Sequence, residues 1–237
     1  MKWNFWIFSS LLVLYSGLSH AGVVIGGTRV IYPSDQPEVQ VALKNKDNDK
    51  RYLVQSWVSK LDDSKAPFVI TPPIYKLEEN RETLLHIVYT GSSEALPQDR
   101  ETLFMLNVKS VSAIPEELRN SNTLQFAIKN RMKLFYRPAA LDNNAAKSAW
   151  TSLQFRRERD RLMVKNPTPF YISFGQLSIG GKPLTPSKNQ NTPSALTMMV
   201  APFSEHDFVI PANAKGQLVW TAINDFGSET GQRKQSL

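Results

Sequence analysis

The residue types that most often carry out catalysis are scarce in this sequence of 237 residues. There is no cysteine, and the three histidines, His20, His86 and His206, stand far apart in the chain. The absence of cysteine excludes a cysteine nucleophile, a thiolate zinc site, a cysteine-held iron–sulfur cluster and disulfide bonds. The chain also lacks a G-x-S-x-G elbow, an H-E-x-x-H motif and a P-loop. We therefore predict a protein that is not an enzyme, with no cofactor and no metal site.

One run of charge suggests a different chemistry, the binding of phosphate or nucleic acid. Residues 156–161 read RRERDR, and basic runs of this kind often contact nucleic acid. The run mixes both signs of charge and lies between two strand patterns, which predicts a solvated turn. The first 21 residues indicate export from the cytoplasm, which also removes most nucleic-acid partners. We therefore predict no nucleic-acid binding.

The first 21 residues have the organisation of a cleaved secretory signal. Lys2 supplies a positive charge, residues 3–18 are mostly apolar, and Ser19 and Ala21 place small residues where a signal peptidase reads them. The apolar run is shorter than a membrane span and is interrupted by serines and a glycine. We predict export from the cytoplasm, cleavage after Ala21 and a mature protein that is not embedded in a membrane. Cleavage lowers the formal net charge of +7 by one.

The mature chain has the composition of a globular protein and the pattern of an all-β fold. Its hydrophobic share is 41%, which excludes collagen-like and coiled-coil classes. Apolar residues alternate with polar ones in segments such as 39–43, 53–58, 83–89 and 104–108, and Pro, Gly, Asn and Asp separate them. The spacing favours β-sandwiches. Only residues 115–119 suggest a helical turn.

A change in amino-acid composition divides the mature chain into two parts. Residues 139–148 are small and polar, which is typical of an exposed linker, and strand patterns resume after them. We predict an N-terminal domain over residues 22–141 and a C-terminal domain over residues 142–237. The tail from Gly231 to Leu237 shows no strand pattern, and we expect it to be loose.

Five segments of the mature chain carry family-specific motifs, namely Thr28–Pro33, Pro97–Phe104, Arg131–Pro138, Asn166–Tyr171 and Ile223–Gly227. They span essentially the whole mature chain, and the KLFYRP sequence within the third is highly specific. In the same order, they resemble segments of the periplasmic pilus chaperones, the PapD-like family. The resemblance implies two immunoglobulin-like β-sandwich domains set in an L, with a cleft between them. The short connection between Val111 and Leu124 resembles the short-loop branch, which typically serves rod-like pili.

The resemblance assigns roles to two cations. It places Arg29 and Lys133 in the cleft, where they anchor the C-terminal carboxylate of a pilus subunit. A guanidinium offers a planar fork of donors and an ammonium a point charge, so the two together suit a carboxylate. From charge alone, both would be read as solvated surface residues.

A second element is the apolar alternation before Lys133. Leu124, Phe126 and Ile128 share one face by the period of a strand. From the pattern alone, this could equally be a strand that faces its own core. In the family, the last strand of the first domain donates such residues to a groove in the subunit. Since strict alternation from Ile128 does not place Lys133 on the donor face, we expect a twist or a bulge between them.

The third group occupies family positions that form a salt-bridge network between the domains. Its members are Glu101, Arg137 and Asp225. Because a buried ion pair costs desolvation, such a network specifies orientation more than it adds stability.

The function implied by the resemblance is that of a periplasmic chaperone. It binds pilus subunits by donor-strand complementation and delivers them to an outer-membrane usher. We also expect self-association when no subunit is bound. The alternative left open by the sequence is an exported adhesive or scaffolding immunoglobulin-like module that recognises a ligand through its loops.

Overall fold

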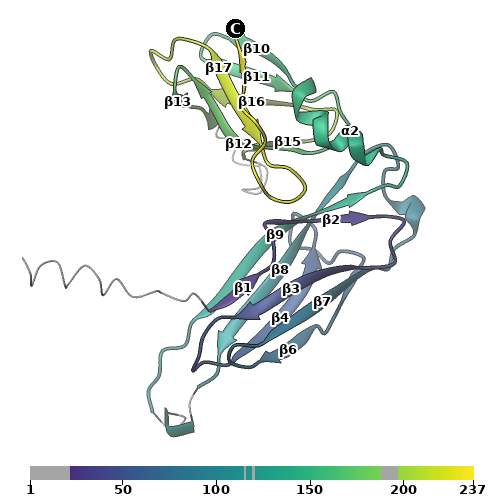
Figure 1. Cartoon of the computed structure of the whole chain (residues 1–237), viewed down its shortest axis with the longest axis vertical. Coiled ribbons are helices and arrows are strands. Elements are labelled where there is room, and N and C mark those ends of the chain that lie inside the picture. The colour runs from purple at the N-terminus through teal and green to yellow at the C-terminus, as the bar shows by residue number, and fades with distance from the viewer. Residues whose placement is uncertain (1–21, 115, 119–120, 188–196) are drawn as a thin grey trace, which may run out of the picture.

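The chain folds into two β-domains that meet at an angle. The computed structural model describes residues 22–114, 116–118, 121–187 and 197–237, so the predicted signal sequence lies outside the described residues. Each domain has its own hydrophobic core, and the two are set like the arms of an L (Figure 1). The predicted fold class of two immunoglobulin-like sandwiches is therefore confirmed. No helix of the described ranges is long and apolar enough to cross a membrane.

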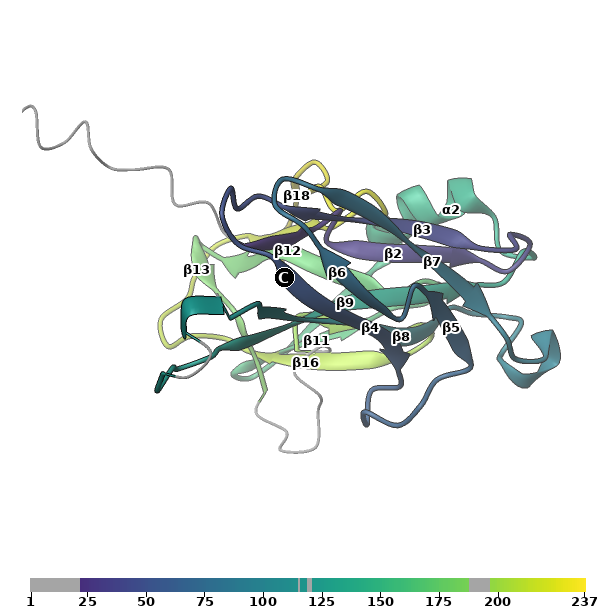
Figure 2. The same cartoon turned by 90° about the horizontal axis from the view of Figure 1, so that it is seen from below.

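The N-terminal domain is a sandwich of two sheets, which lie nearest the viewer in Figure 2. The first sheet has the order β1-β3-β7-β5, namely β1 Val23–Ile25, β3 Val39–Asn45, β7 Glu82–Tyr89 and β5 Phe68–Thr71. The second has the order β2-β9-β8-β4-β6, namely β2 Arg29–Pro33, β9 Ala127–Arg137, β8 Thr102–Ser112, β4 Tyr52–Ser59 and β6 Ile74–Leu77. Two short 3-10 turns are η1 Ser93–Ala95 and η2 Glu116–Leu118, and the second falls within the predicted helical turn.

The core of this domain comes from the alternation that the sequence shows. Leu43 and Ile87 of one sheet and Leu106, Val108 and Leu134 of the other are fully buried. Burying each such side chain contributes about 1.5–3 kcal/mol relative to leaving it exposed. The domain is therefore stabilised by burial and does not require a disulfide.

Strand β9 changes in both pairing and burial along its length. It pairs antiparallel with β8 over almost its whole length and parallel with β2 only from Lys133 onward. Its first residues, Ala127–Lys129, are exposed, whereas every residue from Leu134 to Arg137 is buried. One strand therefore belongs to the core at one end and projects beyond it at the other.

The C-terminal domain is a smaller sandwich, with the yellow and green strands of Figure 1. One sheet has the order β10-β11-β16-β14, namely β10 Gln154–Glu158, β11 Arg161–Lys165, β16 Glu205–Val209 and β14 Thr185–Pro186. The other has the order β13-β12-β17-β18, with β15 also paired to β12, namely β13 Lys182–Pro183, β12 Ile172–Ile179, β17 Leu218–Ala222, β18 Arg233–Gln235 and β15 Met199–Val200.

Two expectations about irregular segments were wrong. The polar segment 139–148 is not only a linker, because it contains helix α2 Asn143–Ser148, followed by the 3-10 turn η3 Ala149–Ser152. Asp142 caps α2 by accepting the backbone N–H of Asn144 at 2.8 Å. The tail is not wholly loose either, since β18 pairs with β17 at the sheet edge. Edge strands need only one partner, so a short polar segment can form one without an apolar pattern.

Candidate functional site

The pairing of β2 with β9 places two cations side by side. Arg29 and Lys133 are direct partners in this parallel pair, and both side chains reach toward the C-terminal domain. Arg29 Nη1 donates to the carbonyl oxygen of Ile223 at 3.0 Å. Lys133 Nζ lies 3.5 Å from Ser173 Oγ and 3.6 Å from Met199 Sδ. The structure therefore brings these two predicted residues together at the junction of the domains.

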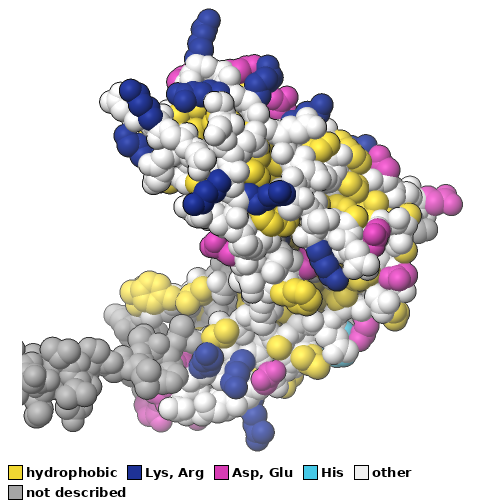
Figure 3. Space-filling model, turned by 45° about the horizontal axis from the view of Figure 1, so that its top comes forward, with side chains coloured by type: hydrophobic (Ala, Val, Ile, Leu, Met, Phe, Trp, Pro, Cys, Tyr) yellow, Lys and Arg dark blue, Asp and Glu magenta, His cyan; other side chains and the backbone are white. Residues whose placement is uncertain are grey.

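A hollow of about 410 Å³ adjoins both cations, in the cleft between the two lobes (Figure 3). Arg29, Lys133 and Arg131 line it from the N-terminal domain, with Ile223 and Gly227 opposite. Gly227 has a φ of +84° and lies against the Thr28 side chain, where a Cβ would collide with Thr28 Oγ1. This close approach holds the loop of the C-terminal domain at the floor of the hollow.

The electrostatics of this pair are unfavourable in the free protein. Burial, together with the positive charge of Arg29, lowers the pKa of Lys133 from 10.5 to about 8. Burial also lowers the pKa of Arg29, although Asp225 and Glu101 partly offset this. Arg29 Nε is buried without a hydrogen-bond partner, and no carboxylate of the described residues forms an ion pair with either cation. The arrangement can hold an anion that brings its own negative charge.

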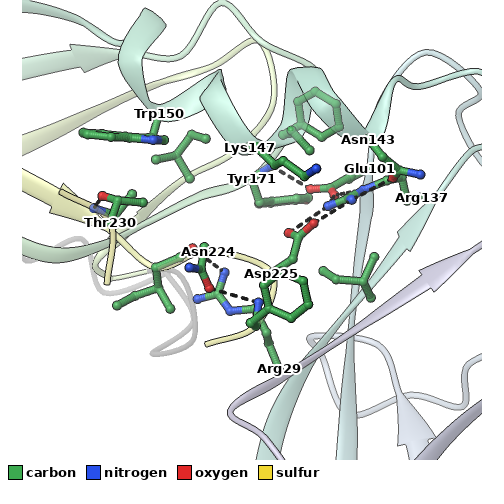
Figure 4. Close-up of a pocket in the computed structure, with 17 residues that line it drawn as sticks. Arg29, Glu101, Arg137, Asn143, Lys147, Trp150, Tyr171, Asn224, Asp225 and Thr230 are labelled. Atoms are coloured by element: carbon green, nitrogen blue, oxygen red, sulfur yellow. Dashed lines mark hydrogen bonds and ion pairs between the residues drawn. The ribbon is translucent and has the colours of Figure 1, made fainter. Parts of the chain in front are cut away.

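An ion network centred on the buried Arg137 joins the two domains (Figure 4). Arg137 Nη2 and Nε each lie 2.8 Å from Glu101 Oε1, and Arg137 also forms a bidentate pair with Asp225 at 2.8 and 3.0 Å. The other oxygen of Glu101 accepts the backbone N–H of Tyr171 at 2.8 Å. Burial lowers the pKa of Arg137, but the two carboxylates more than offset it, so the pKa is raised overall. Glu101 thus binds the C-terminal domain at Tyr171, and Arg137 binds it at Asp225.

Helix α2 adds a contact to this network that the sequence did not suggest. Asn143 Oδ1 accepts a hydrogen bond from Arg137 Nη1 at 3.1 Å. A cavity of about 620 Å³ lies beside the network, and Asn143, Trp150 and Phe170 are among its walls. The guanidinium of Arg137 also stacks over the Phe170 ring at 5.3 Å. The sequence signal that could have indicated these contacts is Asp142, a favourable N-cap residue, directly before residues 143–148.

The three predicted donor residues are exposed. The exposed fractions of Leu124, Phe126 and Ile128 are 81%, 69% and 58%. Only Ile128 lies within β9, because regular pairing begins at Ala127. The edge of β9 from Ala127 to Met132, on the side away from β8, has no strand partner among the described residues. An apolar row and an open strand edge therefore occur together.

The sequence predicted a twist or a bulge between Ile128 and Lys133, and of these the bulge is absent. β9 pairs with β8 without a register shift from Ala127 to Tyr136. Ile128 therefore shares its face with Met132, Leu134 and Tyr136 of the core, by strict alternation. Lys133 lies on the opposite face. Of the donor residues, Ile128 therefore continues the inner face of the domain, and the two cations belong to the outer face.

The other chemistry-bearing residues form local contacts. His86 Nδ1 lies 2.9 Å from Glu38 Oε1, and the ring of His206 stacks on that of Phe208. Within the described ranges, no three His, Asp or Glu side chains are grouped as a metal site. In the RRERDR run, Arg156 pairs with Glu158 and Glu205, and Arg161 with Asp207. The run is the hairpin that the sequence predicted, and two of its four arginines form ion pairs.

Comparisons with known proteins show the family. Residues 22–142 match the N-terminal domain of the pili and flagellar-assembly chaperone PapD, and residues 148–234 match the C-terminal domain of the pili assembly chaperone PapD. The chain therefore belongs to the PapD-like family of pilus chaperones.

Individual relatives match over nearly their whole length. The chaperone protein FocC of Escherichia coli is 39% identical over 228 residues, which are 95% of this chain and 95% of the relative. The chaperone protein FimC of Escherichia coli strain K12 is 36% identical over 221 residues, which are 93% of this chain and 86% of the relative. The SafB chaperone of Salmonella enterica, solved in complex with the SafA pilin, is represented by a structure with a TM-score of 0.76 and 33% identity; the match covers 93% of this chain and 99% of the solved one.

From the geometry of the ion network, we predict that its two carboxylates contribute differently to the free energy of unfolding. The Glu101 side chain is 3% exposed and the Asp225 side chain 36%. Glu101→Ala leaves Arg137 buried without its main partner, so we expect the free energy of unfolding to fall by about 3–5 kcal/mol. Asp225→Ala should cost about 1 kcal/mol or less but should broaden the distribution of interdomain distances. Urea denaturation and small-angle X-ray scattering check these outcomes, and equal losses of stability would contradict the assignment.

The Lys133 site predicts a variant that is more stable than the natural protein. Because folding lowers the pKa of Lys133, the unfolded chain binds more protons between pH 8 and 10.5. The penalty for burying the charge is therefore complete below pH 8 and disappears as the pH rises to 10.5. Lys133→Met should raise the free energy of unfolding at pH 7 by about 1–2 kcal/mol, and the gain should shrink toward zero near pH 10.5. A Lys133→Met variant less stable than the natural protein at pH 7 would refute this account.

Proposed function

We propose that this protein is a non-enzymatic periplasmic chaperone that captures pilus subunits by donor-strand complementation and delivers them to an outer-membrane usher. The observation that carries the proposal is the composition of β9. The strand and the exposed residues just before it present an apolar row, Leu124, Phe126 and Ile128, and the outer face of the same strand presents Lys133 beside Arg29. Membership of the PapD-like family supports the role in pilus assembly, and delivery to an usher is carried by that membership alone.

The capture step follows from strand addition. A pilus subunit that lacks its last strand has an open groove, and open sheet edges promote aggregation. The residues before Ala127 and the open edge of β9 offer main-chain hydrogen bonds together with apolar side chains. Burying Leu124, Phe126 and Ile128 is worth about 5–8 kcal/mol before the costs of ordering. The structure of SafB with the SafA pilin supports the choice of a pilus subunit as partner.

The anchoring step follows from the paired cations. A C-terminal carboxylate between Arg29 and Lys133 would supply the negative charge that the described residues do not. It would also raise the pKa of Lys133 back toward the usual range. Binding therefore recovers the free energy that the buried cation costs the free protein. Anchor and donor row together would fix both the end and the register of the subunit strand.

The location follows from the sequence and from the relatives. The predicted signal with cleavage after Ala21 would export the chain, and the related SfaE is a periplasmic chaperone. The absence of cysteine makes folding independent of disulfide formation in that compartment.

The anchor predicts a loss of capture without a loss of fold. Arg29→Ala and Lys133→Ala should each abolish co-purification of co-expressed pilus subunits, because each removes charge-assisted hydrogen bonds to the carboxylate. Thermal unfolding should stay cooperative in both. The matched control is Lys165→Ala, which removes an exposed cation from the C-terminal domain. Normal recovery of subunits with either anchor variant would overturn the mechanism.

The donor row predicts that polar substitutions separate capture from stability. Leu124→Ser, Phe126→Ser and Ile128→Ser should each change the free energy of unfolding by less than about 0.5 kcal/mol, since the side chains are exposed. Combined, they should weaken subunit binding by about 100-fold or more. Leu84→Ser, on a strand of the other sheet and 43% exposed, is the control. Unchanged binding by the triple variant would instead favour the adhesive or scaffolding module.

A further inference from the structure

The open edge of β9 is bordered by a groove that is longer than the anchor requires. A hollow of about 370 Å³ lies between β1 and Asn130–Met132 of β9. The hollow of about 410 Å³ at Arg29 and Lys133 adjoins it, because Thr28 and Arg131 line both. The groove therefore follows the unpaired edge up to the cations. Its position along an unpaired strand edge suits one extended segment of polypeptide.

The outer face of β9 beside this groove is strongly basic. Lys129, Arg131 and Lys133 alternate along the strand, so all three share that face. Lys109 of β8 is the direct cross-strand partner of Lys129, and Arg29 of β2 is the partner of Lys133. We call these five residues the basic track. It crosses three adjacent strands of one sheet.

Within the described residues, one carboxylate forms ion pairs with the track. Asp63 Oδ1 lies 3.1 Å from Arg131 Nη2 and 3.9 Å from Lys129 Nζ. Asp63 is itself 59% exposed, so these pairs contribute little to stability. Like charges placed directly opposite each other on a sheet are destabilising. Local arrangements that oppose stability are expected where function needs them.

The proposed function sets the direction of a segment bound in the groove. If its C-terminal carboxylate lies at Arg29 and Lys133, the chain must run parallel to β9, with its earlier residues beside Arg131 and then Lys129. In paired strands, side chains at neighbouring positions share a face. The outward side chains of the segment would then lie next to the basic track, while its inward side chains follow the donor row.

We propose that the basic track selects pilus subunits whose last strand has acidic side chains on its outward face. This inference rests on the proposed function and adds a specificity to it. Arg131 is the central residue because it lines both hollows. Lys129, which stacks over Trp57 at 5.2 Å, and Lys109 extend the positive surface. The anchor recognises the end common to every chain, whereas the track distinguishes one sequence from another.

Three synthetic peptides of about ten residues test the proposal, a length that spans the groove at about 3.3 Å per residue. In the first, valine alternates with glutamate; in the second, valine alternates with glutamine; the third is the first with an amidated C-terminus. All are labelled at the N-terminus, and binding to the full-length mature protein is measured by fluorescence anisotropy. We expect the acidic peptide to bind about tenfold more tightly than the glutamine peptide at low salt, with the difference shrinking as salt rises.

Variants assign that preference to the track. The double variant Lys129→Gln and Arg131→Gln should bind both free-carboxylate peptides equally, and Arg131→Gln alone should lose most of the preference. The Lys129 side chain is 40% exposed and the Arg131 side chain 34%, and their ion pairs with the exposed Asp63 contribute little, so the midpoint of thermal unfolding should change by only a few degrees. The control Lys165→Gln removes one exposed positive charge elsewhere and should keep the full preference. A preference that persists in the double variant would overturn the proposal.

The amidated peptide separates this proposal from the carboxylate anchor. Weaker binding on amidation, with equal binding of the acidic and glutamine peptides, would support the anchor and refute the role of the track. A preference for the acidic peptide that depends on Arg131, with no effect of amidation, would support acid recognition by the track and refute the anchor. Failure of all three peptides to bind at millimolar concentration would refute both.

Discussion

The buried guanidinium of Arg137 is the interaction on which the rest of the site depends. It joins Glu101 of the N-terminal domain to Asp225 of the C-terminal domain, with both ion pairs within hydrogen-bond distance. The loop that contains Asp225 also contains Ile223 and Gly227, which border the Arg29 and Lys133 hollow. The ion pair with Asp225 therefore ties the N-terminal domain to the segment that lies opposite the two cations. A buried network of this kind adds little net stability, and its proposed role is to set the relative orientation of the domains.

Strand β9 organises the remaining features, because a strand has two faces and two edges. Its inner face passes from the core to the exposed Ile128, with Phe126 and Leu124 just before the strand, and its outer face has the cations. One edge is paired to β8, while the other is paired to β2 only in its second half. Each proposed element of recognition uses a different part of the same backbone. The regular register keeps these parts in a fixed relation, since a slip of one residue would exchange the two faces.

The sequence predicted the fold class well, because the period of two and the turn residues are local signals. The pairing of Arg29 with Lys133 and the three members of the ion network followed from a family resemblance, since no local pattern reports contacts between residues so far apart. Helix α2 was missed because its six residues are too short and polar for a periodic pattern. The bulge in β9 was wrongly expected because Ile128 and Lys133 were assumed to act on one face. The groove beside Asn130–Met132 could not be predicted, because it depends on where β2 stops pairing.

The uniform register of β9 has a consequence for which substrates fit. Within β9, from Lys133 back to Ile128, the chain spans five residue steps, or about 17 Å at the rise of an extended strand. Under the proposed mechanism, a subunit must place its terminal carboxylate at one end of this interval and its groove along the rest. The backbone of the chaperone thus sets a fixed distance between the carboxylate anchor and the donor side chains. A subunit whose last strand is too short or too long could satisfy one end only, so length itself becomes a property that the protein measures.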